Sequence, residues 1–561
     1  MASSLTGVGV SPGVGYGPAV AVIDAVPEPP DLPATGSAEQ ESEAAAAALE
    51  AVATDLEARA VKAGGEAQEV LEAQAMMARD PSLATQIAGK CEAGSTAARA
   101  TYEALGAYAD MLAASGSDYL AGRVADLHDI RARTVARLLG VPEPGIPDLS
   151  EPSVLVARDL APADTALLNK DLVTAFVTAE GGPTSHTSIL ARNYGIPAVV
   201  GCPGATDVEP GTLLLVDGAN GTVELNPAEV HVSAALAKDA KRRAALAGSG
   251  TGPGRTADGH AVALLANIGG PEDVDAAVAA GAEGVGLFRT ELSFLDRADA
   301  PSETEQVAIY SAVMAGFEGK KVVVRTLDAG ADKPLPFMPF GEEPNPAMGV
   351  RGLRICMQAP EILATQLAAL RTSAASTGAE LWVMAPMVAD MAEAAWFRSQ
   401  CHRAGLAGPI GVMVEIPAAA LRAKQLGTVA DFFSIGSNDL TQYTFAADRQ
   451  VGAVARLQEA WQPALLDLIA LTAEGAAAND TPCGVCGEAA ADPLLACVLV
   501  GLGVTSLSMS PGAIAGVRSA LAAHSLDQCQ AAAEAAREAV SAAAAREAAR
   551  TYLSEMDALG L

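Results

Sequence analysis

The segment 181–188 reads Gly-Gly-Pro-Thr-Ser-His-Thr-Ser and contains one of only six histidines in the 561-residue chain. A helix-like run, Ile189 to Asn193, follows at once. Glycine lets the backbone approach a ligand closely, and a helix N-terminus offers unpaired N–H groups and a partial positive charge to an anion. The same positive end disfavours imidazolium, so we expect His186 to stay neutral and nucleophilic near neutral pH. The segment favours a histidine that carries a phosphoryl group over one in an ordinary strand-to-helix turn.

A second group of chemically useful residues follows strand-like runs in the C-terminal part of the chain. Catalytic residues of a (β/α)₈ barrel gather where the strands end, and several arginines lie at or soon after such ends. Arginine grips phosphate and carboxylate oxygens in pairs, so we predict an anion clamp for a small ligand with more than one anionic group. Its members are Arg289, Arg325, Arg351 and Arg449.

Two carboxylates, Glu415 and Asp439, end consecutive strand candidates and are expected to lie side by side. Carboxylates, water and substrate oxygens are the usual environment of Mg²⁺; the alternative is that each carboxylate pairs with an arginine. Cys486 follows the next candidate, and a thiol can protonate a carbanion or enolate carbon. A buried structural thiol is the competing interpretation. Cys483 and Cys486 form a single CxxC motif. Because no second pair accompanies it, the motif does not favour a zinc site or redox chemistry.

The elements that must position these residues alternate between strand and helix from residue 260 onward. The spacing predicts strands at residues 262–265, 285–288, 321–325, 381–385, 410–414, 432–435, 481–485 and 506–508. Their number and the length of the region favour a (β/α)₈ barrel over a doubly wound sheet. We therefore predict an α/β protein whose C-terminal domain, residues 260–561, is such a barrel.

The N-terminal part is expected to contain two further domains and a connector. Residues 1–22 and 145–228 hold strand-like runs with helices between them and predict a compact α/β domain that carries His186. Residues 23–144 are Ala-rich with helical spacing, as at Leu49, Val52 and Leu56, and predict an inserted helical bundle. Residues 229–259 predict a linker helix followed by a Gly-rich hinge.

The charge of the chain restricts its partners. Lys plus Arg total 36 against 67 Asp plus Glu, a net charge of −31, which repels nucleic acid and anionic lipid but attracts a basic partner. We expect no signal peptide, no membrane insertion and no nucleic-acid role. Eight scattered cysteines fit a reducing cytoplasm better than a disulfide framework.

These motifs resemble the phosphoenolpyruvate-utilising enzymes, and most closely the enzyme I group of the bacterial phosphoenolpyruvate:sugar phosphotransferase system. The resemblance covers essentially the whole chain. It is carried by the inserted bundle and by residues 181–188, 286–291, 345–351, 434–443 and 485–488. Pro183 departs from it, since the family often has a basic residue there, and this puts one phosphate contact in doubt. Met348-Gly349-Val350 stands where a bulkier residue often precedes the arginine.

The resemblance implies a phosphoenolpyruvate-protein phosphotransferase. His186 would take the phosphoryl group from phosphoenolpyruvate, with release of pyruvate, and pass it to a histidine of the small carrier HPr. The four arginines and Asn438 would bind substrate, Glu415 and Asp439 would hold Mg²⁺, and Cys486 would protonate the enolate. The α/β domain would swivel, the acidic bundle would dock HPr, and the barrel would form a homodimer.

Two other readings compete with this one. An ATP-coupled relative, a phosphoenolpyruvate synthase or pyruvate phosphate dikinase, needs a large nucleotide-binding domain, whereas the sequence before His186 is mostly helical and has no Gly-rich phosphate loop. A regulatory scaffold with a decayed site would not keep every expected polar residue at the strand ends. The sugars served downstream are not predicted.

Overall fold

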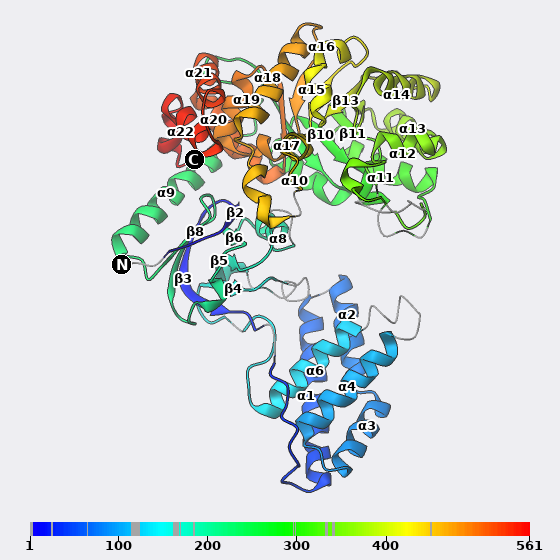
Figure 1. Cartoon of the computed structure of the whole chain (residues 1–561), viewed down its shortest axis with the longest axis vertical. Coiled ribbons are helices and arrows are strands. Elements are labelled where there is room, and N and C mark those ends of the chain that lie inside the picture. Colours follow the sequence, from blue (N-terminus) through cyan, green and yellow to red (C-terminus); the bar gives the residue numbers. More distant parts are fainter. Residues whose placement is uncertain are drawn as a thin grey trace. The chain divides into compact units, whose positions relative to one another are not determined.

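A computed structural model describes residues 4–23, 26–63, 65–113, 124–147, 149–160, 168, 170–182, 186–248, 250–294, 297, 299–330, 335–338, 343–448 and 451–561. The chain splits into two compact units, Met1–Ala237 and Lys238–Leu561 (Figure 1). No helix in these ranges combines the length and the hydropathy that a membrane crossing requires. The finer division of the N-terminal unit remains the prediction made above.

The N-terminal unit contains a mixed sheet. Within the described residues its eight strands lie in the order β1-β8-β7-β3-β4-β5-β6-β2, with parallel pairing from β3 to β6 and antiparallel pairing on both sides. The helix α8, His186–Tyr194, covers one face, where Ala191 packs in a cluster with Phe176 and Val200. The strands are β1 Ser4–Thr6, β2 Val8–Ser11, β3 Val14–Ala21, β4 Ser153–Ala157, β5 Val173–Thr178, β6 Ala198–Val200, β7 Leu213–Asp217 and β8 Thr222–Leu225.

The predicted helical insertion is present between β3 and β4. Leu49, Val52 and Leu56 are buried in its core, which confirms the helical spacing. Asp80 caps α3 by accepting a hydrogen bond from the backbone N–H of Ser82 at 2.7 Å. The helices are α1 Ala38–Ala63, α2 Gly65–Ala78, α3 Pro81–Glu92, α4 Ala97–Ala113 and α6 Val124–Leu139.

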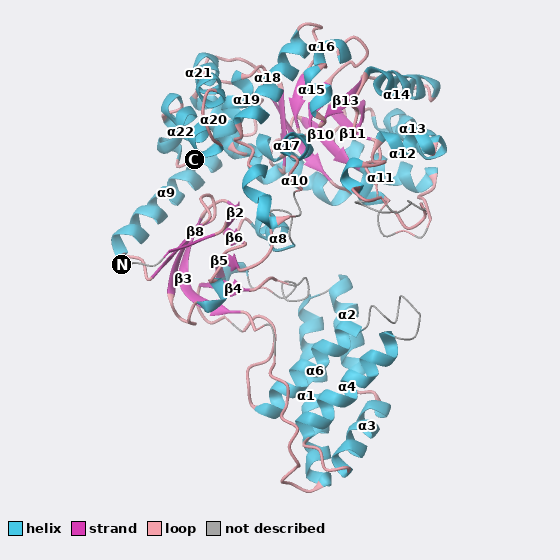
Figure 2. Cartoon of the chain, in the orientation of Figure 1, coloured by secondary structure: helices cyan, strands magenta, loops and turns pink. Residues whose placement is uncertain are grey.

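The C-terminal unit confirms the barrel. All eight predicted strands exist and close in the order β9 to β16 with parallel pairing throughout (Figure 2). They are β9 Ala263–Ile268, β10 Gly284–Arg289, β11 Lys321–Arg325, β12 Glu380–Ala385, β13 Ile410–Val414, β14 Phe433–Ile435, β15 Cys483–Val485 and β16 Ser506–Met509.

Helices surround the barrel and pack on its outer face in one large apolar core. They are α10 Val274–Ala279, α11 Glu303–Ala315, α12 Leu353–Gln358, α13 Pro360–Thr377, α14 Met391–Arg403, α15 Pro417–Leu421, α16 Ala423–Leu426, α17 Ser437–Phe445, α18 Pro463–Ala477, α19 Pro493–Gly501, α20 Ile514–Ala523, α21 Leu526–Arg537, α22 Ala542–Tyr552 and α23 Glu555–Leu559. The interior is filled by a separate cluster, so the barrel is a packed core and not a pore.

The Gly-rich segment 248–259, expected to act as a hinge, is fixed to the barrel unit. It follows the linker helix α9, Glu229–Gly248. The backbone N–H of Gly254 donates to Glu283 at 2.9 Å, and Arg518 donates to the carbonyl of Gly250 at 2.8 Å. A Cβ on Gly254 would lie 2.3 Å from a carbonyl oxygen. The glycine at this position therefore serves close packing, and the hinge at 248–259 stays a prediction.

Candidate active site

The barrel brings most of the predicted site residues to one rim. Arg289 and Arg325 are the last residues of β10 and β11, and Glu415 follows β13 directly. Asp439 lies in the first turn of α17 after β14, and Cys486 follows β15. Because parallel strands end at the same face of a barrel, these side chains meet although they are far apart in sequence.

Arg351 is the centre of a buried charge network at this rim. It reaches the network from the loop after β11 and is fully buried. Its Nη1 donates to Asp439 Oδ1 at 3.1 Å, and its Nη2 donates to Asp439 Oδ2 at 3.2 Å, a two-pronged contact. Nη2 also lies 3.3 Å from Asp328 Oδ2, and Nη1 donates to the Tyr443 hydroxyl at 3.2 Å.

Arg325 shares this network and is almost equally buried. Its Nη1 lies 3.1 Å from Asp328 Oδ2, and its Nη2 donates to Glu291. Within the described part of the chain, two polar atoms of this pair, Arg325 Nε and Glu291 Oε2, are buried with no hydrogen-bond partner. Buried polar groups without partners are costly, and here they offer a donor and an acceptor to a ligand.

Glu415 is a buried carboxylate whose surroundings disfavour its ionised form. Its Oε1 accepts a hydrogen bond from the backbone N–H of Met387 at 2.6 Å. Met387 itself has a φ of 57°, a left-handed conformation that costs a non-glycine residue about 1–3 kcal/mol. Burial, together with the neighbouring Asp439 and Asp328, raises the pKa of Glu415 to about 8. The site therefore stores both backbone strain and electrostatic repulsion.

The buried charges of the rim do not balance. Four carboxylates, those of Glu291, Asp328, Glu415 and Asp439, face two guanidinium groups, and all six side chains are buried. When all four carboxylates are ionised, two negative charges are uncompensated among these six groups, which fits one divalent cation. No three His, Cys, Asp or Glu side chains of the described residues form a metal-binding group. Two of these carboxylates, Glu415 and Asp439, are the ones that the sequence predicts as ligands of such an ion.

Cys486 lies in the apolar cluster inside the barrel and is 2% exposed. Burial raises the pKa of its thiol, while Arg325 and Arg289 act in the opposite direction. The thiol therefore stays protonated and beside cationic groups. Cys483 belongs to the cluster outside the barrel, since residues three apart on a strand point to opposite faces. The two thiols of the CxxC motif are therefore not placed to bind one metal ion together or to form a disulfide with each other.

The remaining predicted residues are only partly defined. Asn438 lies in the first turn of α17, and its Oδ1 accepts a hydrogen bond from the backbone N–H of Glu488 at 3.2 Å. Arg289 is half-buried and has no carboxylate partner among the described residues, so its charge remains available to an anion. Arg449 lies outside the described residues.

His186 is the first residue of α8 in the N-terminal unit, as the sequence predicts, and its side chain lies outside what is described. The next residue anchors the helix, because the Thr187 hydroxyl donates to Asp159 Oδ1 at 2.9 Å and accepts from the Leu160 N–H at 3.3 Å. The preceding loop turns at Gly181, whose φ of 92° suits glycine. The start of the helix is thus held in place through Thr187.

Sequence reasoning did not assign a role to three members of the rim: Glu291, Asp328 and Tyr443. Glu291 and Asp328 follow the strand-end arginines within three residues. This position could have indicated that both carboxylates lie at the rim. Tyr443 lies one turn after Asp439 on α17, so helical spacing places both on one side. Their role is to hold the guanidinium groups in place.

Comparisons with known proteins agree with this geometry. Residues 243–526 match the PEP-binding domain of PEP-utilising enzymes, residues 149–221 match their mobile domain, and residues 6–123 match their N-terminal region. The chain is 60% identical over 557 residues to the phosphoenolpyruvate-protein phosphotransferase of Streptomyces coelicolor, covering 99% of this chain and 100% of that protein. The protein of the same name from Latilactobacillus sakei is 38% identical, over 92% of this chain and 93% of that protein. The protein of the same name from Bacillus subtilis is 39% identical, over 81% of this chain and 82% of that protein.

The chain belongs to the family of phosphoenolpyruvate-utilising enzymes. Its relatives over almost the full length are phosphotransferases, and the chain is a phosphotransferase of this family.

Proposed function

We propose that the chain transfers the phosphoryl group of phosphoenolpyruvate first to its own His186 and then to a histidine of the carrier HPr. The buried rim of the barrel carries this proposal, because it combines fixed guanidinium groups, more buried carboxylates than guanidinium groups and a protonated thiol. The names of the relatives favour this activity over ATP-coupled synthesis of phosphoenolpyruvate.

In the proposed reaction the imidazole of His186 attacks the phosphorus atom, a P–N bond forms, and the bond from phosphorus to the enol oxygen breaks. Arg289, Arg325, Arg351 and Arg449 hold the phosphate and carboxylate and stabilise the charge that develops on the leaving oxygen. Asn438 contributes to phosphate binding. Cys486 then donates its proton to the methylene carbon of the enolate, which yields pyruvate and a thiolate that regains a proton from solvent.

Glu415 and Asp439 would hold Mg²⁺, which supplies charge neutralisation on the phosphoryl oxygens. Asp439 is already positioned by Arg351 and Glu415 by the backbone of Met387. We further propose that the acidic bundle docks HPr, that the N-terminal α/β domain swivels between barrel and carrier, that the barrel forms a homodimer, and that the enzyme works in the cytoplasm.

Mass spectrometry tests the central assignment directly. We expect incubation with phosphoenolpyruvate and Mg²⁺, without ATP, to add one phosphoryl group, and peptide mapping under conditions that preserve phosphohistidine to place it on His186. A phosphoryl group on another residue, or a requirement for ATP, would refute the proposal.

Replacing Cys486 by alanine should slow pyruvate formation by about 100-fold or more, the usual contribution of a positioned general acid. Phosphoenolpyruvate affinity should change little, because the arginines remain. Stopped-flow measurement of pyruvate release beside calorimetric binding separates the two effects. Cys483→Ala is the matched control, since that thiol lies on the outer side of the same strand; equal rates in both variants would remove the acid role of Cys486.

Replacing Glu415 by glutamine should abolish the stabilisation that Mg²⁺ confers. A folded-state pKa near 8, above the usual 4.5, means that the metal-free fold binds an extra proton between these values. The stability that this extra proton gives to the metal-free fold is present at low pH and is lost as the pH rises toward 8. We expect the Tm of the metal-free parent to fall more steeply than that of Glu415→Gln between about pH 5 and about pH 8. Parallel Tm profiles, or equal Mg²⁺ affinity, would contradict the assignment.

A further inference from the structure

A cationic hollow lies on the outside of the barrel unit, on α14, and takes no part in the site at the strand ends. Five residues of α14 line it, spaced so that they share one helical face, and Val429 closes it from the turn before β14. The hollow is wide and shallow, and it is largely open to solvent. The five residues are Ala395, Arg398, Ser399, His402 and Arg403.

The charge of this hollow is opposite to that of the chain as a whole. The chain carries a net charge of −31, yet the side chains that line the hollow include two arginines and a histidine, and of these Arg398 is paired with Asp431. His402 and Arg403 are exposed and lie in the last turn of α14, where basic residues also complement the helix dipole. Arg398 lies before that turn, so the dipole does not account for it.

Arg398 is held in a fixed position at the edge of the hollow. Its Nη1 donates to the Val429 carbonyl at 2.6 Å and to Asp431 Oδ1 at 2.9 Å. Asp431 is fixed in turn, because its Oδ2 accepts from the Ile410 N–H at 2.9 Å. Within the described residues these hydrogen bonds use only one nitrogen of Arg398. The guanidinium is therefore preorganised and keeps further N–H groups for a ligand.

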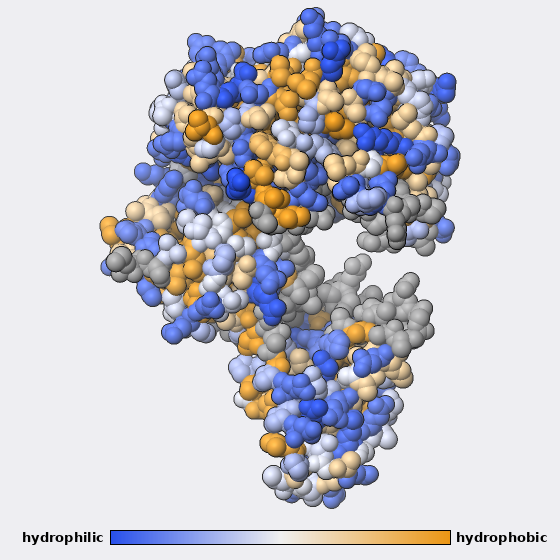
Figure 3. Space-filling model, in the orientation of Figure 1, coloured by the Kyte–Doolittle hydropathy of each residue, from blue (hydrophilic) through white to orange (hydrophobic). Residues whose placement is uncertain are grey.

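We propose that this hollow between α14 and Val429 binds a small phosphate-bearing anion. Two arginines provide forked donors that match phosphate oxygens, and the His402 ring and Ser399 hydroxyl can complete the contacts. Figure 3 shows hydrophilic side chains over the part of the barrel surface where α14 lies. A dry apolar ligand would not suit such a surface.

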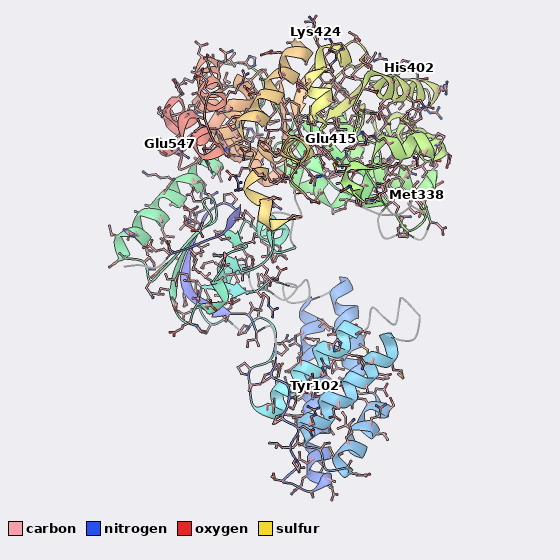
Figure 4. The ribbon with its side chains drawn as sticks, viewed as in Figure 1. Tyr102, Met338, His402, Glu415, Lys424 and Glu547 are labelled. Carbon is pink, nitrogen blue, oxygen red and sulfur yellow. The ribbon has the colours of Figure 1, made fainter. Side chains whose placement is uncertain are left out.

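The site is separate from the catalytic rim. β13 begins at Ile410 and β14 shortly after Asp431, beside the hollow, whereas the opposite ends of these strands lead to Glu415 and Asp439. Figure 4 shows His402 at the outer edge of the barrel unit and Glu415 within it. An anion in the hollow would thus not compete with substrate for the arginines of the rim.

Histidine NMR tests the site without reference to catalysis. The full-length protein, labelled with ¹³C at its six histidines, is titrated with inorganic phosphate and, in a second arm, with glycerol phosphate, at constant ionic strength maintained with NaCl. His402→Asn identifies the His402 cross-peak. We expect this peak to move in a saturable manner, and the arm that saturates at the lower concentration shows whether free phosphate or a phosphate ester is preferred.

Arg398→Gln and Arg403→Gln should each raise the half-saturating concentration about tenfold, as expected for loss of one charge-assisted hydrogen bond. Arg546→Gln, the same charge change on α22, should leave the titration unchanged. Pyruvate formation should persist in all three variants, because none of these residues lies at the rim. A linear shift in both arms, or equal shifts in Arg403→Gln and the parent, would overturn the proposal.

Discussion

Replacing His186 by alanine should abolish phosphoryl transfer completely. Neither the phosphoenzyme nor phosphorylated HPr should form, because the variant has no nucleophile to accept the phosphoryl group. Phosphoenolpyruvate binding should be largely retained, since the arginines and carboxylates lie in the C-terminal unit. Incorporation of labelled phosphate, measured beside calorimetric substrate binding, distinguishes these two effects.

The matched control for this variant is His231→Ala. His231 is an exposed histidine of α9 whose Nδ1 lies 3.0 Å from a carboxylate oxygen of Glu224. It lies in the same compact unit as His186, and its loss should leave incorporation unchanged. Labelling of His186→Ala at the level of the control would show that another residue accepts the phosphoryl group.

Replacing Arg351 by methionine is expected to have the largest combined effect on stability and activity. The side chain is fully buried and contacts Asp439 through both nitrogens of its fork. Its removal leaves buried carboxylates uncompensated, which typically costs about 3–5 kcal/mol. Substrate turnover should fall as well, because Asp439, the proposed metal ligand, loses its positioning. Urea unfolding and pyruvate release measure the two losses separately.

Arg354→Met provides the comparison three residues along the chain. Arg354 pairs with Glu393 at 3.4 Å in a partly exposed position, and such pairs contribute only about 0–1 kcal/mol. The two variants remove the same group and differ chiefly in burial and partners. If Arg351→Met were no less stable than Arg354→Met and equally active, the central place of Arg351 in the rim would be wrong.

Much of the barrel could be predicted because its strands are short apolar runs separated by amphipathic helices, which leave a clear pattern. The same holds for the position of His186, since two glycines and a helix start mark the turn. The short strand β8, Thr222–Leu225, was missed because it carries Glu224 and is only partly buried, so it lacks an apolar run. The strand lies between β1 and β7, and short strands of this kind depend on their neighbours more than on their own sequence.

The partners of the rim arginines could not be predicted from the sequence. A strand end locates a side chain on the correct face of the barrel, but which carboxylate meets which guanidinium depends on loops that fold back over the rim. Arg351 shows this well, because its contact with Asp439 joins residues 88 apart in the chain. The Gly-rich segment 248–259 shows a related limit of the sequence, because close packing and flexibility both favour glycine, and the packing of Gly254 became visible only in its contacts.

The opposite directions of Cys483 and Cys486 also bear on how the enzyme withstands oxidative stress. Cys486, the proposed proton donor, is not placed to form a disulfide with Cys483, because the two thiols lie in clusters on opposite sides of the barrel wall. A peroxide would have to diffuse into the barrel mouth to inactivate it, and phosphoenolpyruvate bound there would shield it. Substrate should accordingly protect the enzyme against inactivation by peroxide.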